Sequence, residues 1–212
     1  MFGKLFGFGK KEDPNVEKFE SQDPDPSLGN FEVKWNSKYL TKRDYNTFTK
    51  EFEKRKWQEK SLMVGVYSEI FTNTFADWVE KEPNSYLAHL FKGANEVFLA
   101  WEARSGKFAK EVNDDQWQGF NDHLTKAEEH FNRSVELNPN EAETYARMIP
   151  MYMGLSDKEG VLATFNKAIA LNPNHVVAHT YTLNALKEKW LGSKKEMYEF
   201  ADNAIKRNDF PY

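Results

Sequence analysis

The chain has 212 residues, of which 40% are hydrophobic and 29% are charged, and this composition allows one compact domain with a tail. Its net charge of −4 gives no electrostatic attraction to phosphates, so nucleic acid is not expected as a partner. The sequence contains no cysteine, which excludes disulfides, thiolate nucleophiles and cysteine-based zinc sites.

Residues 1–30 are predicted to form a flexible leader, because Gly, Pro, Asp and Ser recur there without periodicity. Residues 1–11 combine phenylalanine with lysine, so weak contact with an anionic membrane surface is one interpretation and a disordered terminus is the other. The segment lacks the continuous apolar stretch and the cleavage site of a signal peptide. We therefore expect a cytoplasmic protein.

From Asp44 onward the apolar residues recur at intervals of three and four, which is the spacing of amphipathic helices. Asp44 is expected to cap one helix, and Ser61 is expected to cap a second helix that continues to Val79. The segment Phe31–Asn36 is the single candidate for a strand. The sequence therefore predicts a helical domain over residues 31–212.

Residues 130–140 align without a gap with residues 164–174, and both segments carry an aromatic residue, a small residue and a proline in the same order. Phe131 and Phe165 occupy equivalent positions 34 residues apart. This spacing and pattern resemble the tetratricopeptide repeat, whose unit is a pair of antiparallel helices. The resemblance implies an all-α, right-handed superhelix of three to four helix pairs in which Phe131 and Phe165 are both buried.

The interval from Pro83 to Pro139 exceeds one repeat by 22 residues. These additional residues are expected to lengthen the helix around Trp101 and to add a loop, or a short helix near Val112. Pro150 falls inside the next helix, which we expect to be kinked. The last two predicted helices, residues 176–190 and 193–205, form a terminal pair.

Residues 40–210 also resemble an uncharacterised family of bacterial proteins similar to tetratricopeptide arrays. The resemblance depends on Gly93-Ala94, on Ala100-Trp-Glu-Ala-Arg104 and on Lys189-Trp-Leu-Gly-Ser193. It implies no particular function.

Two pairs of histidines stand at helical spacing in the sequence. His175 and His179 have the four-residue spacing of two metal ligands on a helix, but no third ligand is evident. We interpret both as structural, and we expect neither a metal nor another cofactor. His123 and His130 are interpreted as part of a solvated helix face. The sequence also lacks a set of nucleophile, base and orienting residue, so we do not expect an enzyme.

Trp101, Glu102 and Arg104 stand beside the predicted insert. We interpret them as a stacked ion pair that fixes the insert, and contact with a ligand or a partner is the alternative. The second candidate surface follows from the resemblance to tetratricopeptide arrays, which usually bind through the concave surface of their first helices. The register places four residues on that surface: Arg147, Tyr181, Asn184 and Lys187.

We therefore predict that these four residues, together with the Trp101–Arg104 region, bind another protein or a peptide. The predicted function is that of a bacterial adaptor or scaffold. The alternative is an immunity protein that neutralises a cognate toxin, because negative charge accelerates the capture of a basic enzyme.

Overall fold

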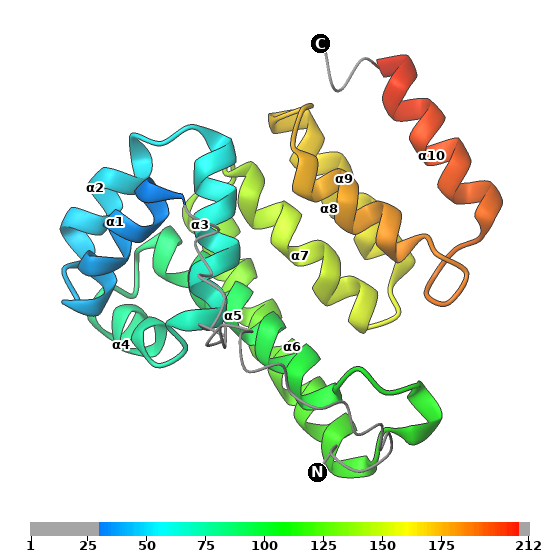
Figure 1. The fold of residues 1–212 in the computed structure, drawn as a ribbon, viewed down its shortest axis with the longest axis horizontal. Helices are drawn as coiled ribbons and strands as arrows, with labels where there is room; N and C mark the ends of the chain where they lie inside the picture. The colour runs from blue at the N-terminus through cyan, green and yellow to red at the C-terminus, as the bar shows by residue number, and fades with distance from the viewer. Residues whose placement is uncertain (1–29, 208–212) are drawn as a thin grey trace, which may run out of the picture.

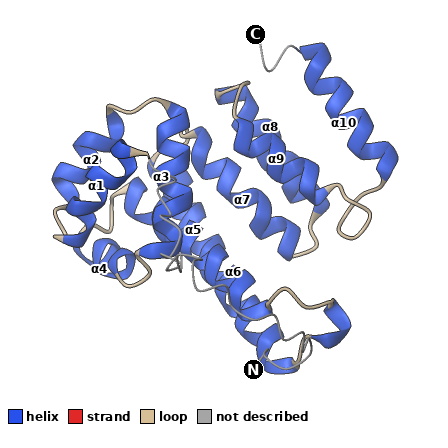
Figure 2. Cartoon of the chain, in the orientation of Figure 1, coloured by secondary structure: helices blue, strands red, loops and turns tan. Residues whose placement is uncertain are grey.

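The computed structural model describes residues 30–207, which fold into helices without a strand (Figures 1 and 2). Within this range, ten α-helices and one short 3-10 helix follow one another: α1 (Phe31–Thr41), α2 (Tyr45–Glu53), α3 (Trp57–Ile70), α4 (Thr74–Lys81), α5 (Tyr86–Arg104), η1 (Ala109–Glu111), α6 (Asp114–Leu137), α7 (Ala142–Gly154), α8 (Lys158–Leu171), α9 (Val176–Ala185) and α10 (Lys194–Arg207). The all-α class is thereby confirmed for these residues. The expectations for residues 1–29, including membrane contact, concern residues outside the described range. None of the described helices combines the length and the apolar character that crossing a bilayer requires.

The N-terminal helices assemble around Phe91, which lies near the start of α5. The centroid of the Phe91 ring is 5.3 Å from that of Phe75, 5.5 Å from that of Phe48 and 5.8 Å from that of Trp78. All four side chains are fully buried. Aromatic pairs at these distances stabilise a core beyond the effect of burial alone. Phe91 therefore joins α2 and α4 to the long helix α5.

Helices α5 and α6 form a long hairpin whose far end extends away from the other helices (Figure 1). The far halves of both helices, the loop after Arg104 and the short helix η1 together make up the predicted insert. The insert is therefore a lengthened helical hairpin, and the prediction of a short helix near Val112 is confirmed by η1.

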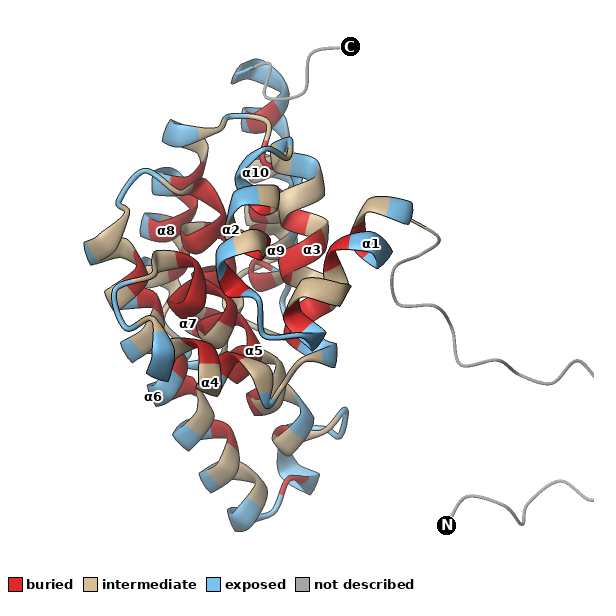
Figure 3. Ribbon diagram, turned by 90° about the vertical axis from the view of Figure 1, so that its left-hand side faces the viewer, coloured by how far each residue is buried: buried red, intermediate tan, exposed pale blue. Residues whose placement is uncertain are grey.

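Helix α7 lies at the centre of the C-terminal half. It packs on α8 and α9 and also contacts α3, α5 and α6, and buried residues gather where these helices meet (Figure 3). Helix α7 continues through Pro150 to Gly154. Helix α10 packs mainly on α9 and is further held by the Phe200 ring, whose centroid lies 4.9 Å from that of Phe165.

The single candidate for a strand, Phe31–Asn36, is helical instead and forms the first part of α1. The side chain of Asn30 accepts a hydrogen bond from the backbone N–H of Val33, 3.1 Å away, and so caps the helix. Val33, Asn36 and Leu40 are buried at the spacing of one helical face. A short apolar pattern is compatible with both a strand and a helix, and here the Asn30 cap indicates a helix.

The expectation that Ser61 caps a helix running to Val79 is also wrong. Ser61 lies one turn inside α3, where it is buried. The stretch that was expected to be one helix is two, because α3 ends at Ile70 and α4 begins at Thr74. The intervening residues are Phe71, Thr72 and Asn73; Thr and Asn disfavour helix interiors. Asp44, by contrast, caps α2 by accepting a hydrogen bond from the backbone N–H of Thr47.

Gly93 offers a test of the close packing between α5 and α6. A Cβ atom added at Gly93 would lie 2.7 Å from Cδ1 of Phe131, and the Phe131 ring is fully buried and cannot withdraw. We expect Gly93→Ala to lower the free energy of unfolding by about 1–3 kcal/mol, although alanine favours a helix over glycine by about 1 kcal/mol. Urea unfolding monitored by circular dichroism measures the difference.

Gly65→Ala in α3 is the matched control. Its added Cβ would lie 3.4 Å from the nearest nitrogen of Arg147, which is an ordinary contact. The control should be as stable as the wild type or slightly more stable. Equal stability of the Gly93→Ala and Gly65→Ala variants would contradict the described packing.

Candidate functional site

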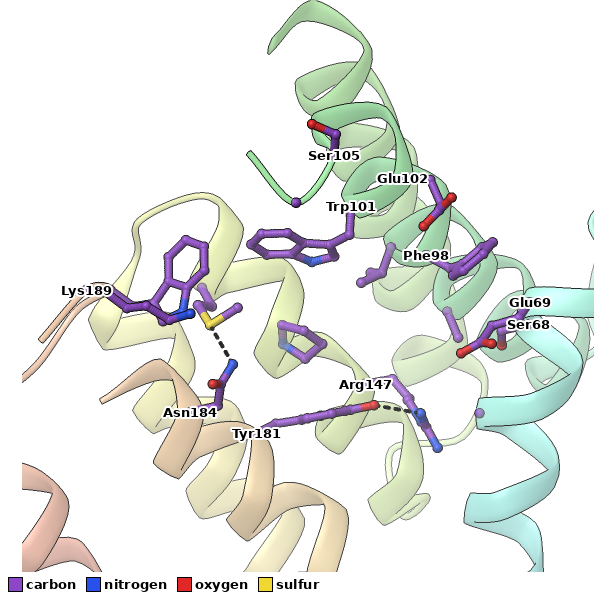
Figure 4. A pocket seen from close by; sticks show the side chains of 17 residues that line it. Ser68, Glu69, Phe98, Trp101, Glu102, Ser105, Arg147, Tyr181, Asn184 and Lys189 are labelled. Carbon is purple, nitrogen blue, oxygen red and sulfur yellow. Dashed lines mark hydrogen bonds between the residues drawn. The ribbon is translucent and has the colours of Figure 1, made fainter. Parts of the chain in front are cut away.

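A cavity of about 550 Å³ opens between α3, α5, α7 and α9, and we name it the central pocket. Figure 4 shows its walls: Ser68 and Glu69 come from α3, Phe98, Trp101 and Glu102 from α5, Arg147 from α7, and Tyr181 and Asn184 from α9. The segment after α9 closes one end with Lys189 and Trp190. Binding sites for ligands are typically concave, largely apolar and carry a few polar groups, as this pocket does.

The apolar part of the lining is mostly aromatic. Phe98 and Trp101 project from α5 into the pocket from one side, and Tyr181 lies opposite on α9 (Figure 4). Pro150 and Met153 of α7 line the pocket between them. The amide nitrogen of Asn184 donates to the Met153 sulfur over 3.6 Å, and a thioether is a weak acceptor. The Asn184 amide can therefore exchange this weak hydrogen bond for a stronger one to a ligand.

Two carboxylates line the α3 and α5 side of the central pocket. Glu69 and Glu102 are both exposed, and neither forms an ion pair with the residues that the structure describes. Lys189 is the exposed cation of the opposite side, and its ammonium lies 5.4 Å from the centroid of the Trp190 ring. The pocket therefore offers an aromatic surface with free negative charge along one edge.

Arg147 forms the polar end of the pocket and is almost fully buried, at 7% exposure. Its Nε donates to Oε1 of Glu143 over 2.5 Å, one terminal nitrogen donates to the Tyr181 hydroxyl over 3.0 Å, and the other donates to the Ser61 carbonyl over 2.6 Å. The guanidinium thus joins α3, α7 and α9. Because its donors are largely engaged inside the protein, Arg147 shapes the pocket rather than offering a free cation to a ligand.

Glu143 compensates this buried charge. Burial alone would raise the pKa of the Glu143 carboxyl, but the charge of Arg147 and the nearby His175 outweigh it and hold the pKa well below its usual range. His175 Nε2 lies 2.9 Å from Oε2 of Glu143. Its Nδ1 accepts the backbone N–H of Ala178, so in the neutral ring the proton sits on Nε2. The carboxylate therefore contacts both groups in its charged form.

Arg104 lies behind the pocket in a cage of three tryptophans. Its guanidinium centre is 5.7 Å from the ring of Trp101, 5.4 Å from that of Trp117 and 5.5 Å from that of Trp190. Cation–π contacts of a desolvated arginine are worth about 2 kcal/mol. The cage fastens the segment after α9 to the hairpin of α5 and α6, and so fixes one wall of the central pocket.

The interpretation of Trp101, Glu102 and Arg104 is corrected in one respect. Arg104 does stack and does fix the insert, but its partners are aromatic rings and the backbone carbonyls of Ser105 and Lys107. Within residues 30–207, Glu102 and Arg104 form no ion pair. Glu102 is free to face the pocket because aromatic rings and carbonyls already satisfy the arginine.

The structure brings five of the seven candidate contact residues to one place. They line the central pocket: Trp101, Glu102, Arg147, Tyr181 and Asn184. Arg104 is buried in the cage behind it, and Lys187 lies at a separate groove beside α10. The sequence reasoning missed the pocket residues Glu69, Phe98 and Trp190. The aromatic and charged character of all three was visible, but nothing local indicated that they would converge.

The histidines are placed as follows. His175 caps α9 and contacts Glu143, and Nδ1 of His179 lies 3.0 Å from the carbonyl oxygen of His175. The interpretation of His123 and His130 as a solvated face is wrong, since both point at α5. His123 Nδ1 lies 2.6 Å from Oε2 of Glu96, and His130 Nδ1 lies 3.1 Å from Nδ1 of His89. Burial and the neighbouring His89 lower the pKa of His130 to about 4.

No group of three potential ligand side chains in the described part of the chain is arranged to hold a metal ion. The pocket lining contains no histidine, and the hydroxyl of Ser68 donates to the Val64 carbonyl within its own helix. A serine engaged in this way, with no base beside it, is not an activated nucleophile.

Glu143→Gln tests the buried pair. The substitution keeps the shape of the side chain but leaves the Arg147 charge uncompensated, which costs roughly 3–5 kcal/mol for a buried pair. The same substitution at the exposed Glu136, paired with Arg133 on the surface of α6, should change stability little. Urea unfolding at pH 7 compares the two variants, and equal effects would contradict the role assigned to Glu143.

The effect of Glu143→Gln should depend on pH. Because the folded protein holds the carboxyl pKa below its ordinary value of 4.5, the carboxylate stabilises the fold at a pH above that value. This contribution is lost as the pH falls below about 4.5 towards the folded pKa. The difference in unfolding free energy between the wild type and the variant should therefore shrink as the pH is lowered from 5 to 3.

Comparison with known proteins assigns the chain to a family but to no activity. No curated protein and no solved structure is significantly similar to it. A family model described as a domain of unknown function, DUF4034, matches residues 38–165, from within α1 to within α8. The match is to an uncharacterised family, as the second resemblance implied, and it does not name tetratricopeptide repeats. More than half of the chain is covered, and the protein therefore belongs to the DUF4034 family.

Proposed function

We propose that this protein is a non-enzymatic binding module whose central pocket receives a segment of a partner protein. The observation that carries the proposal is the lining itself: aromatic side chains from α5 and α9 face one another beside two carboxylates that form no ion pair within residues 30–207. Aromatic residues are the ones that most often anchor protein interfaces. An apolar or aromatic side chain of the partner would fill the pocket.

The charges of the lining favour a basic partner segment. Glu69 and Glu102 stand on the α3 and α5 side, where a lysine or arginine flanking the anchor would meet them. The net charge of −4 also attracts a basic partner over longer distances. Asn184 adds an amide whose present acceptor is weak, and a backbone group of the partner would be a better one.

The arrangement of helices supports a finer proposal about the fold, namely a superhelix similar to tetratricopeptide arrays. Arg147 and Tyr181 are 34 residues apart, one repeat length, and they are joined by a hydrogen bond between α7 and α9. Phe131 and Phe165, also one repeat apart, are both buried. In such an array the first helices of successive pairs lie side by side, and the central pocket would then lie on their common surface.

A narrower candidate is an immunity protein that neutralises a cognate toxin. The free carboxylates at the pocket favour it, because they would meet a basic surface on the toxin. If a toxin encoded beside this gene is co-expressed, the protein should protect the host cell, and charge reversal at Glu69 and Glu102 should abolish protection. Without such a toxin, the adaptor or scaffold role is the better description.

Selection from a random peptide library on the immobilised protein tests the central proposal. The selected peptides should carry an aromatic or large aliphatic residue beside lysine or arginine. Trp101→Ala should weaken their binding roughly tenfold or more, as removal of an interface anchor does. Trp35→Ala on α1, which removes an exposed tryptophan outside the pocket, is the matched control and should have no effect.

Because Trp101 also contacts Arg104, a second variant separates binding from folding. Glu69→Lys with Glu102→Lys alters only exposed side chains and should keep the circular dichroism spectrum of the folded wild type while weakening basic peptides. Glu129→Lys, an exposed carboxylate of α6, is its control. Selected peptides without basic residues, or affinities unaffected by both pocket variants, would contradict the proposal.

A further inference from the structure

We propose that a second surface, the groove between α9 and α10, binds an acidic amphipathic helix of a partner protein. This α9–α10 groove has a volume of about 520 Å³ and is separate from the central pocket, with Lys189 at the boundary between them. The inference does not depend on the function proposed for the central pocket, because the two surfaces otherwise use different residues.

The floor of the groove is apolar. Leu183 contributes from α9, and Met197, Tyr198 and Ala201 contribute from α10. Tyr198 is 69% exposed and Ile205, two turns along the same helix, is 76% exposed. Met197, Tyr198, Ala201 and Ile205 follow the spacing of one helical stripe, which extends over about 12 Å.

This stripe is not the face by which α10 is attached to the rest of the protein. The attachment is made by Phe200, whose ring lies 4.9 Å from that of Phe165, and by Ala204, the one buried residue of α10. The terminal helix of a helical array usually turns a polar face to water. Here its outer side carries apolar groups at helical spacing, which indicates a docking surface for another helix.

The rim of the groove determines the charge of the partner. Lys187, just after α9, and Lys194, the first residue of α10, are both exposed, and Lys189 lies between them in the sequence. None of these three lysines forms an ion pair within the described range, and Glu188 is the one acidic residue of the lining. A local excess of positive charge on a chain with a net charge of −4 is complementary to an acidic partner.

The occupant that fits both features is a helix with one apolar face and carboxylates beside it. Its apolar residues, spaced three and four apart, would lie along Tyr198 and Leu183. Its flanking carboxylates would meet Lys187 and Lys194. An extended segment would present alternate side chains to opposite faces and would match the stripe of α10 less well.

The test uses a fluorescein-labelled designed peptide of about 18 residues, long enough for a helix of about 27 Å. It carries leucine and phenylalanine at helical spacing and glutamate elsewhere, and a matched peptide replaces every glutamate with lysine. Fluorescence anisotropy with the full chain should show that the acidic peptide binds at least roughly tenfold more tightly at low salt, with the preference reduced at high salt.

Charge reversal makes the test specific. The double variant Lys187→Glu with Lys194→Glu should reverse the preference between the two peptides. Lys107→Glu with Lys126→Glu, two exposed lysines of the hairpin, should leave it unchanged. Tyr198→Ser should weaken the acidic peptide without changing the melting temperature, because its side chain is exposed. The charge reversals at Glu69 and Glu102 should have no effect here, which separates this surface from the central pocket.

Several results would overturn the proposal. One is equal binding of the two peptides to the wild type, and another is an unchanged preference in the Lys187→Glu, Lys194→Glu variant. A dimer in sedimentation experiments that this variant dissociates would show that the groove receives a second copy of the chain. A large gain in peptide affinity after removal of residues 1–29 or 208–212 would show that the chain's own terminus occupies it.

Discussion

The guanidinium of Arg147 lies at the meeting point of α3, α7 and α9, where it is almost fully buried. An arginine side chain does not lose its charge by deprotonation, so the fold must supply partners from each neighbouring element. Glu143 supplies the countercharge from the same helix, Ser61 supplies a carbonyl from the N-terminal half, and Tyr181 supplies a hydroxyl from the C-terminal half. The relative positions of the three helices, and hence the walls of the central pocket, follow from satisfying this one cation.

The repeat in the sequence correctly predicted two helix ends and two buried aromatic residues in the C-terminal half. An aromatic residue, a small residue and a proline recur at a fixed interval there, and each has a direct physical role. Phe131 and Phe165 are buried, and α6 and α8 each end just before the proline of their segment. Gly93, one of the residues on which the family resemblance depends, is explained by the Phe131 ring against its backbone. Patterns of this kind are local, so one sequence is sufficient to detect them.

The errors arose where distant parts of the chain decide the local structure. His123 stands among charged residues in the sequence, but Glu96 of another helix is its partner. Arg104 has a glutamate two residues away, yet tryptophans from three separate segments surround it. Arg147 lies at the pocket, but the Tyr181 hydroxyl and the Ser61 carbonyl, both far away in the sequence, already accept hydrogen bonds from it. The spacing of residues indicates which face a side chain shares, but not which distant group will meet it.

The cage around Arg104 contains three of the six tryptophans of the chain. One of them, Trp190, belongs to the segment that follows the part of the chain matched by the family model, and the other two belong to the hairpin. Indole emission depends on the polarity around the ring and on nearby charged groups. The intrinsic fluorescence of the protein is therefore a built-in optical signal for the attachment of its last two helices, and this signal is distinct from the loss of helical structure itself.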